Sequence, residues 1–144
     1  MKVTYPVIFT DVESNILIEV PDLAILTEAN EEGKRKGSMA DAIMMARDAI
    51  GITCIQSEDE GKELIEPTPL SQIDVSTGAF AEDGQCFVSL VDVDLEIYRR
   101  RADNKVVRTN VTLPNWLKLE AERAEINVSK VLQEALMTKL GVYR

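Results

Sequence analysis

The sequence predicts an α+β protein built from two modules: an antiparallel sheet that carries a helix, then a small strand-helix-helix unit. β-prone segments near the N-terminus precede a helix-periodic segment, and residues 105–144 place one strand before two helices. The charge divides at the same point. Residues 1–98 hold 6 Lys and Arg against 20 Asp and Glu, whereas residues 99–144 hold 10 against 5. Net charges of −14 and +5 indicate modules whose partners have opposite signs.

The composition of the whole chain excludes several classes of function. At 144 residues, 45% hydrophobic and 28% charged with a net charge of −9, it is typical of one or two small globular domains. The absence of His removes His-based acid/base chemistry, the usual catalytic triads and most zinc sites. No apolar run approaches the ~18 residues of a membrane span, so we expect a cytoplasmic protein without membrane partners. Cys54 and Cys86 lie outside any metal-binding or redox spacing.

The N-terminal module begins with three predicted strands, over residues 3–10, 16–20 and 23–28, with short turns between them. This order predicts a meander. Pro6 places the first strand at a sheet edge or at a strand start, because proline cannot donate to a ladder.

A polar loop over residues 29–37 leads to a predicted helix. Ser38 followed by Asp41 is typical of a capping box, and apolar residues then recur at helical spacing as far as Ile50. One face of the helix is expected to pack on the sheet. The methionines of this segment are expected in the core rather than at an adaptable binding surface; they are Met39, Met44 and Met45.

Residues 87–98 are predicted to form a further strand, because apolar and acidic residues alternate strictly over residues 91–97. The apolar residues would face a core. The acidic residues would line the solvent side; they are Asp92, Asp94 and Glu96.

The basic, polar segment 99–104 is interpreted as a linker. The predicted domains are therefore residues 1–98 and residues 105–144, joined by this linker.

The second module is predicted to contain, in this order, a strand over residues 105–113, a helix over about 115–125, and a second helix. Pro114 ends the strand and suits the first turn of a helix. Asn127 is typical of an N-cap, and Gly141 is typical of a helix end. A unit this small cannot bury enough apolar surface alone, and its single strand has no partner, so two copies must pair.

Pairing would place the two strands antiparallel in one ribbon and the four helices around one core. The residues expected in this dimer core are apolar; they are Val111, Leu113, Trp116, Leu117, Val131, Leu132 and Leu136. The two-residue period of a strand turns Arg108, Asn110 and Thr112 outward.

These outward residues suit the major groove of double-stranded DNA, which accepts a two-stranded ribbon. Arg can bond a guanine edge, Asn an adenine edge, and Thr offers its hydroxyl or its methyl group. At the start of the second helix, the free N–H groups and the residues Asn127, Ser129 and Lys130 could hold a backbone phosphate. The alternative is a dimerisation module whose strand face is merely solvated. The basic linker and the net charge of +5 argue against it.

The C-terminal sequence RTNVTLP followed by NWLKLEAERAEINVSKVLQEAL resembles the ribbon-helix-helix fold of bacterial repressors. The resemblance covers about the last 40 residues and includes the S-x-x-L-x-x-A-L stretch that begins at Ser129. Glu125-Ile126-Asn127 stands where many members have Gly at the turn between the helices.

The N-terminal part resembles the HicB antitoxin family at Tyr5-Pro6, at Pro21-Asp22-Leu23 and at the helix start that follows Ser38. The chain departs from the family at Ala24-Ile25-Leu26, which replaces small residues, and in the longer loop over 29–37. The resemblance implies a partial ribonuclease-H-like domain that neutralises a small basic, mRNA-cleaving toxin of the HicA family. It also implies a homodimer that binds operator DNA, represses its own operon and forms a higher hetero-oligomer with the toxin. The net charge of −14 independently favours a basic partner.

Two alternatives remain. One is a ribbon-helix-helix regulator whose N-terminal domain binds a small effector. The other is a metal-dependent nuclease, since carboxylates suit Mg²⁺ or Mn²⁺; its candidate ligands are Asp92, Asp94, Glu96, Asp11 and Glu13. A strongly acidic surface repels a nucleic-acid substrate, and the alternation turns the first three toward water. We therefore expect no catalytic residue, no metal site and no cofactor.

Overall fold

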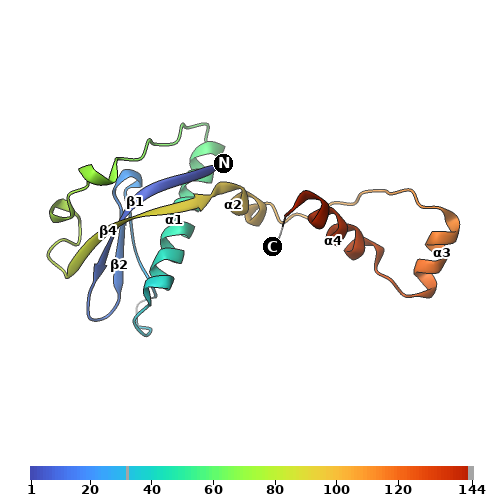
Figure 1. Ribbon diagram of the computed structural model, residues 1–144, viewed down its shortest axis with the longest axis horizontal. Helices are drawn as coiled ribbons and strands as arrows, with labels where there is room; N and C mark the ends of the chain where they lie inside the picture. Colours follow the sequence, from blue (N-terminus) through green and yellow to red (C-terminus); the bar gives the residue numbers. More distant parts are fainter. Residues whose placement is uncertain (32, 143–144) are drawn as a thin grey trace. The chain divides into compact units, whose positions relative to one another are not determined.

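The computed structural model describes residues 1–31 and 33–142 (Figure 1). The chain divides into two compact units, Met1–Asn104 and Lys105–Arg144, here called the N-terminal unit and the C-terminal unit. Each has its own secondary structure and is described separately.

The N-terminal unit contains a four-stranded antiparallel sheet in the order β3-β2-β1-β4. The strands are β1 (Lys2–Asp11), β2 (Ile16–Val20), β3 (Ile25–Glu28) and β4 (Gln85–Asp94). The first three follow one another as neighbours, so the predicted meander is confirmed. Three short 3-10 helices lie in the connections; they are η1 (Pro21–Leu23), η2 (Leu70–Gln72) and η3 (Val75–Thr77).

Strand β1 lies inside the sheet, so the prediction that Pro6 marks an edge strand or a strand start is wrong. Pro6 pairs with Leu90 of β4, but β1 pairs with β2 only from Ile8 to Asp11. At Pro6 the strand therefore has a ladder on one side only. A residue without an N–H is tolerated there, because no second strand requires its donor.

Helix α1 (Met39–Asp59) packs on one face of the sheet. The capping box is confirmed: the Ser38 hydroxyl accepts from the N–H of Asp41 at 3.1 Å, and the Asp41 carboxylate accepts from the N–H of Ser38 at 2.8 Å. The buried residues of the helix are Ala42, Ala46, Ile50, Gly51, Cys54 and Ile55. They pack against the strand residues of the core, which include Tyr5, Val7, Phe9, Ile18, Val91 and Val93.

Two of the three methionines of α1, Met39 and Met44, differ from the prediction of core packing, and Met45 agrees with it. Met39 and Met44 are exposed, Met44 at 62%, and Met45 is partly buried against the core. The buried line of α1 recurs every four residues from Ala42, and Met44 lies two residues off that line. Met39 is the first helical residue and lies at the exposed end of α1.

The opposite face of the sheet is covered by the segment that contains η2 and η3. The N–H of Ala79 donates to the Glu19 carboxylate at 2.9 Å. A Cβ on Gly78 would lie 3.4 Å from the side chain of Ile8. This segment therefore buries the second face of β1.

The chain turns into a helix at Asp94, so the strand predicted over residues 87–98 ends four residues early. Helix α2 (Leu95–Ala102) begins with Asp94 as its N-cap, whose carboxylate accepts from the N–H of Glu96 at 3.1 Å. Glu96 in the first turn and the three arginines in the last turn complement the helix dipole. Residues 99–102, predicted as part of a linker, thus belong to a helix of the N-terminal unit.

Helix α2 is held on α1 by polar contacts. The hydroxyl of Tyr98 donates to Asp48 at 2.6 Å, and Arg99 pairs with Glu58 at 3.4 Å and with Asp59 at 3.0 Å. Burial and the hydrogen bond to Asp48 raise the pKa of Tyr98 to about 12. Arg101 lies over the ring of Tyr98 at 5.2 Å. The arginines that gave the sequence its basic segment are therefore engaged within the N-terminal unit.

Gly51, in the interior of α1, lies against Tyr98: a Cβ there would be 2.6 Å from Cδ2 of the ring. Alanine usually stabilises a helix interior by about 1 kcal/mol relative to glycine. Here it overpacks the α1–α2 contact, which costs about 1–3 kcal/mol. We expect Gly51→Ala to lower the free energy of unfolding in urea denaturation by about 1–2 kcal/mol.

The Tyr98→Ala background is the control for this prediction, because it removes the ring that the new methyl group would meet. In that background Gly51→Ala should be neutral or stabilising. Equal destabilisation in both backgrounds would show that Tyr98 is not the reason for the glycine.

The C-terminal unit contains helices α3 (Asn115–Arg123) and α4 (Val128–Leu140). Residues 105–114 have no regular secondary structure, so the strand predicted over residues 105–113 is not formed in a single chain. A strand needs a hydrogen-bonded neighbour, and residues 105–142 contain no other strand. No helix in the described parts of the chain is long and apolar enough to cross a membrane.

Candidate nucleic-acid interface

The turn between α3 and α4 closes without glycine. Glu125 adopts a left-handed conformation, with φ of 54°. The N–H of Glu125 donates to the carbonyl of Glu122 at 3.1 Å, and the N–H of Ile126 donates to that of Ala121 at 3.0 Å. These two bonds form a Schellman motif, which usually has Gly at the position of Glu125. The departure from the ribbon-helix-helix pattern therefore leaves a helix-turn geometry intact.

The start of α4 brings together the three residues predicted to hold a phosphate. Asn127 is the N-cap, as predicted, and its side chain accepts from the N–H of Lys130 at 3.1 Å. Ser129 and Lys130 are exposed in the first turn. The cap uses one of the first N–H groups of the helix, which leaves those of Val128 and Ser129 available to an anion.

The end of α4 also agrees with the prediction. Gly141 has a φ of 67°, and the N–H of Val142 donates to the carbonyl of Met137 at 2.9 Å. The helix therefore stops at the glycine, in a second Schellman motif.

The three residues predicted to contact bases, Arg108, Asn110 and Thr112, lie in the segment without regular structure, and all are exposed. Without a strand, nothing in one chain forces them onto one face. Thr112 lines a groove of about 540 Å³ together with Val111, Leu113, Lys118, Glu122, Ile126 and Val128. In a single chain Thr112 therefore lies in a groove with apolar and charged neighbours, whereas Arg108 and Asn110 do not line it.

The predicted dimer-core residues are exposed in the single chain, apart from Leu132, which is half-buried. Trp116 is 66% exposed, and Val111, Leu113, Leu117, Val131 and Leu136 are also exposed. No residue is buried among residues 105–142. So many exposed apolar side chains in so small a unit are typical of a surface that a partner covers.

Four of the five carboxylates considered for a nuclease site, all except Glu13, have structural partners. Asp92 pairs with Arg47 at 3.0 Å, and this hydrogen bond lowers the pKa of Asp92. Asp94 caps α2, and Asp11 pairs with Lys36. Over residues 1–31 and 33–142, no three His, Cys, Asp or Glu side chains gather closely enough to hold a metal ion.

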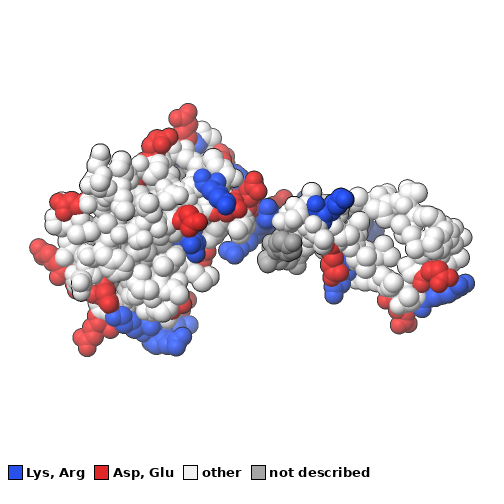
Figure 2. Space-filling model, viewed as in Figure 1, with Lys and Arg blue, Asp and Glu red and all other residues white. Residues whose placement is uncertain are grey.

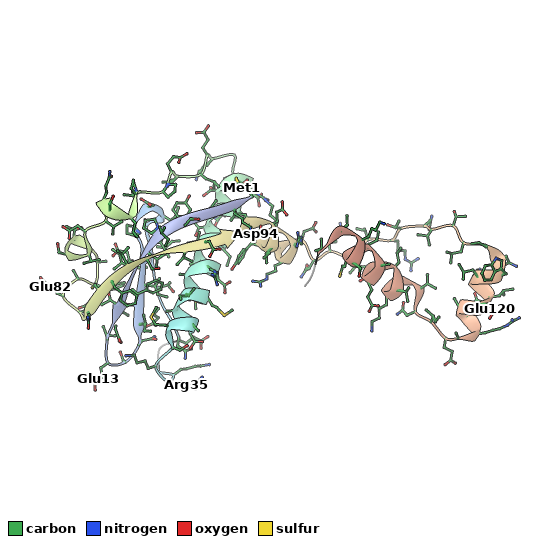
Figure 3. The ribbon with its side chains drawn as sticks, in the orientation of Figure 1. Met1, Glu13, Arg35, Glu82, Asp94 and Glu120 are labelled. Atoms are coloured by element: carbon green, nitrogen blue, oxygen red, sulfur yellow. The ribbon has the colours of Figure 1, made fainter. Side chains whose placement is uncertain are left out.

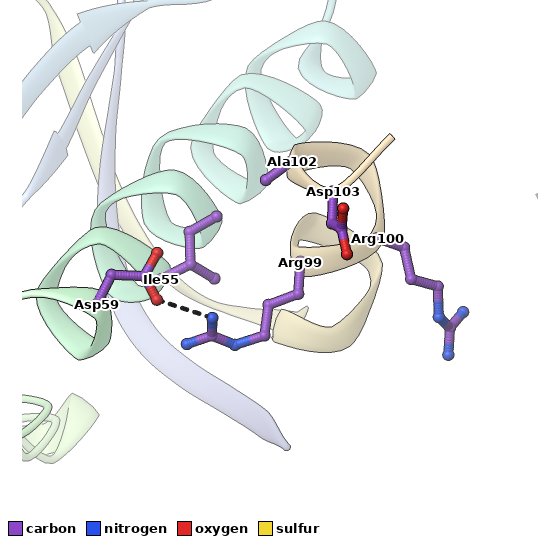
Figure 4. A pocket seen from close by; sticks show the side chains of 6 residues that line it. All are labelled: Ile55, Asp59, Arg99, Arg100, Ala102 and Asp103. Atoms are coloured by element: carbon purple, nitrogen blue, oxygen red, sulfur yellow. Dashed lines mark hydrogen bonds and ion pairs between the residues drawn. The ribbon is translucent and has the colours of Figure 1, made fainter. Parts of the chain in front are cut away.

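A pocket of about 580 Å³ lies between α1 and α2 (Figure 4). Its lining residues are Ile55, Asp59, Arg99, Arg100, Ala102 and Asp103. Arg99 is already paired across it with Asp59, and Arg100 pairs with Glu96 at 3.4 Å. Arg99 and Asp59 therefore hold α2 on α1, and Arg100 is paired within α2. Among the charged lining residues, Asp103 alone has no ion pair in the described part of the chain.

Comparison with known proteins places the fold. No protein-family model matches the chain, and no curated protein matches it either. The chain is similar in fold to a chain of a solved structure described as a toxin-antitoxin complex from Streptococcus pneumoniae, with a TM-score of 0.57 and 22% sequence identity. The match covers 96% of this chain and 99% of that one. Because it is nearly complete on both sides, it includes both the sheet-and-helix unit and the two-helix unit.

Proposed function

We propose that the chain is an antitoxin of the HicB type, acting in the cytoplasm. In this proposal the N-terminal unit is a partial ribonuclease-H-like domain that neutralises a basic, RNA-cleaving toxin of the HicA family. The C-terminal unit is a ribbon-helix-helix module that dimerises and binds operator DNA to repress its own operon. The observation that carries the proposal is the nearly complete fold similarity to a chain of a toxin-antitoxin complex. The HicB-like sequence features support the more specific assignment.

The division of charge follows the two structural units and supports opposite partners. Residues 1–104 hold 9 Lys and Arg against 21 Asp and Glu, and residues 105–144 hold 7 against 4, so the net charges are −12 and +3. An acidic unit steers a basic protein toward it, and added salt weakens this steering. On this proposal the DNA beside the gene should encode a small basic protein, and the toxin role is tested by measuring association of the full chain with that protein. Its rate should fall as salt rises.

The DNA-binding role rests on what a second copy would add to the C-terminal unit. Antiparallel pairing of residues 105–113 from two chains supplies the missing strand partner and covers the exposed apolar side chains of α3 and α4. The two-residue period then turns Arg108, Asn110 and Thr112 to one face. The first turn of α4, with Asn127, Ser129 and Lys130, contacts the phosphate backbone.

Asn110→Ala and Lys130→Ala should weaken DNA binding in different ways. Asn110→Ala removes a base contact, so it should cost about 1–3 kcal/mol on the DNA upstream of the gene and relax the sequence preference. Lys130→Ala removes a phosphate contact, so it should weaken binding to all sequences and lower the salt slope by about one. Gel-shift titrations at several salt concentrations measure both. Unchanged affinity of Asn110→Ala would remove it from the interface.

We further propose that the chain performs no catalysis, since it lacks His and since four of its five candidate metal ligands, all except Glu13, serve as caps or in ion pairs. The pocket between α1 and α2 gives little support to the alternative in which the N-terminal unit binds a small effector. Its charged lining residues Asp59, Arg99 and Arg100 are already in ion pairs, which leaves Asp103 to contact a ligand.

A further inference from the structure

The outer edge of β4 is the longest unpaired strand edge of the sheet. In the order β3-β2-β1-β4 the edge strands are β3, with 4 residues, and β4, with 10. Within the described residues, β4 pairs with β1 alone. An exposed edge strand carries a row of unpaired N–H and C=O groups and is a template for a further strand.

The ladder with β1 determines which backbone groups of β4 point outward. The two strands pair in one continuous register, with Phe9 opposite Phe87. The N–H of Leu95 donates to the carbonyl of Met1 at 3.0 Å and extends that register, so the odd-numbered residues of β4 bond to β1. The even-numbered residues therefore direct their N–H and C=O groups away from β1; they are Cys86, Val88, Leu90 and Asp92.

Two of the outward-pointing carbonyl groups of β4 already accept hydrogen bonds from side chains. The carbonyl of Asp92 accepts from Nε of Arg47 at 3.1 Å, and the carbonyl of Leu90 accepts from the hydroxyl of Ser89 at 3.3 Å. The open stretch is therefore residues 86–90, including the N–H of Leu90. It is long enough for a short strand to pair.

The side chains of this stretch carry no charge. Residues 85–91 read QCFVSLV, with Phe87 exposed against the ring of Phe9 and Leu90 51% exposed. Edge strands are usually protected by charges, prolines or bulges, and β4 has none of these over residues 85–91. Figure 2 shows few charged side chains over the area that β4 crosses in this view, with acidic side chains around its margin.

Acidic residues flank the open stretch at both ends. Glu82 and Asp83 precede β4, and Asp92 and Asp94 end it; Figure 3 labels Glu82 and Asp94 at its two ends. If the β4 edges of two copies paired antiparallel about a two-fold axis, the start of one strand would meet the end of the other. Glu82 and Asp83 of each copy would then approach Asp92 and Asp94 of the other, which is destabilising even though Arg47 is paired with Asp92. A strand from a basic partner avoids this repulsion.

We propose that residues 86–90 of β4 dock an edge strand of a basic partner protein and extend the sheet by one strand. The inference rests on the proposed function, in which that partner is the RNA-cleaving toxin. Backbone hydrogen bonds to Cys86, Val88 and Leu90 hold the added strand, while Phe87 and Leu90 pack on its two faces. The acidic ends select basic residues on either side of the partner's strand.

The variant that tests this is Val88→Pro. Proline has no backbone N–H, and the N–H of Val88 points away from β1, so the variant keeps every hydrogen bond between β4 and β1. The added strand of the partner would lose one hydrogen bond and would clash with the proline ring. Leu26→Pro is the matched control on the other edge. The N–H of Ala29 donates to the carbonyl of Ile16 at 2.9 Å, which shows that the odd-numbered residues of β3 bond to β2. Leu26 is even-numbered, so its N–H also points away from the sheet.

The measurement is calorimetric titration of full-length variants with the small basic protein encoded beside this chain, after circular dichroism has shown that each variant is folded. Val88→Pro should weaken binding about tenfold or more, which corresponds to one lost hydrogen bond. Leu26→Pro should bind as the wild type does. If Val88→Pro does not fold, the partner affinities of Leu90→Lys and Leu26→Lys are compared instead. Leu90→Lys should bind more weakly, because a lysine on the β4 edge repels a basic partner and a lysine on the β3 edge does not.

Wild-type affinity in folded Val88→Pro, or in Leu90→Lys, would overturn the edge-docking proposal while leaving the antitoxin role in place. Concentration-dependent protection of the Cys86, Val88 and Leu90 amides from hydrogen exchange, without any partner, would also overturn it and would identify a second copy as the occupant. If the wild-type chain does not bind the neighbouring protein at all, the proposed function fails instead.

Discussion

Leu132→Asp is expected to abolish the dimer and, with it, operator binding. Leu132 lies on α4 and is half-buried already in the single chain, unlike the other predicted core residues. Pairing would complete its burial. A carboxylate placed there has no partner charge, and burying an unpaired charge costs more than the apolar contacts of so small a unit can offset.

Gln133→Asp is the matched control for this prediction, because Gln133 is the next residue, is exposed and lies outside the predicted core. Sedimentation of the full chain should show a dimer for the wild type and for Gln133→Asp, and a monomer for Leu132→Asp. Gel shifts should show DNA binding lost in parallel with the dimer. A Leu132→Asp protein that still sediments as a dimer would contradict the shared core.

Truncation after Asn104 is expected to separate the two functions completely. Residues 1–104 hold the buried core of the chain, and the polar contacts of Tyr98 and Arg99 tie α2 to α1. The fragment should therefore fold and should inhibit the toxin as the full chain does. It should show no DNA binding, because all proposed DNA contacts lie beyond residue 104.

The position of the cut matters in this experiment. A fragment that ends at Asp94 removes α2, exposes the surface that Leu95 and Tyr98 cover, and leaves Glu58 and Asp59 without Arg99. It should melt at a lower temperature than the 1–104 fragment. A folded 1–104 fragment that fails to inhibit the toxin would move the inhibitory surface into the C-terminal unit.

Local signals predicted the N-terminal elements well. The meander follows from short β-prone segments separated by turns, and the start of α1 follows from Ser38 and Asp41, which need only each other. The end of β4 could not be predicted from alternation, because Leu95 and Tyr98 also suit a helix. Asp94, read as the solvent side of a strand, is instead the cap that starts α2.

The site was less predictable because its parts depend on partners. The strand proposed over residues 105–113 would need a second chain, and a single chain leaves Arg108, Asn110 and Thr112 in a segment without regular structure. Glu125, with its left-handed φ of 54°, shows that the turn between α3 and α4 closes without a glycine. The open β4 edge was not recognised from the sequence, although the uncharged run 85–91 between acidic ends was the signal for it.

Cleavage of RNA by the neighbouring basic protein, measured as the full chain is added, tests the central claim most directly. If the chain is its antitoxin, cleavage should fall to background once the two proteins are present in stoichiometric amounts, and the chain alone should cleave nothing. Undiminished cleavage in the presence of excess folded chain would contradict the antitoxin role.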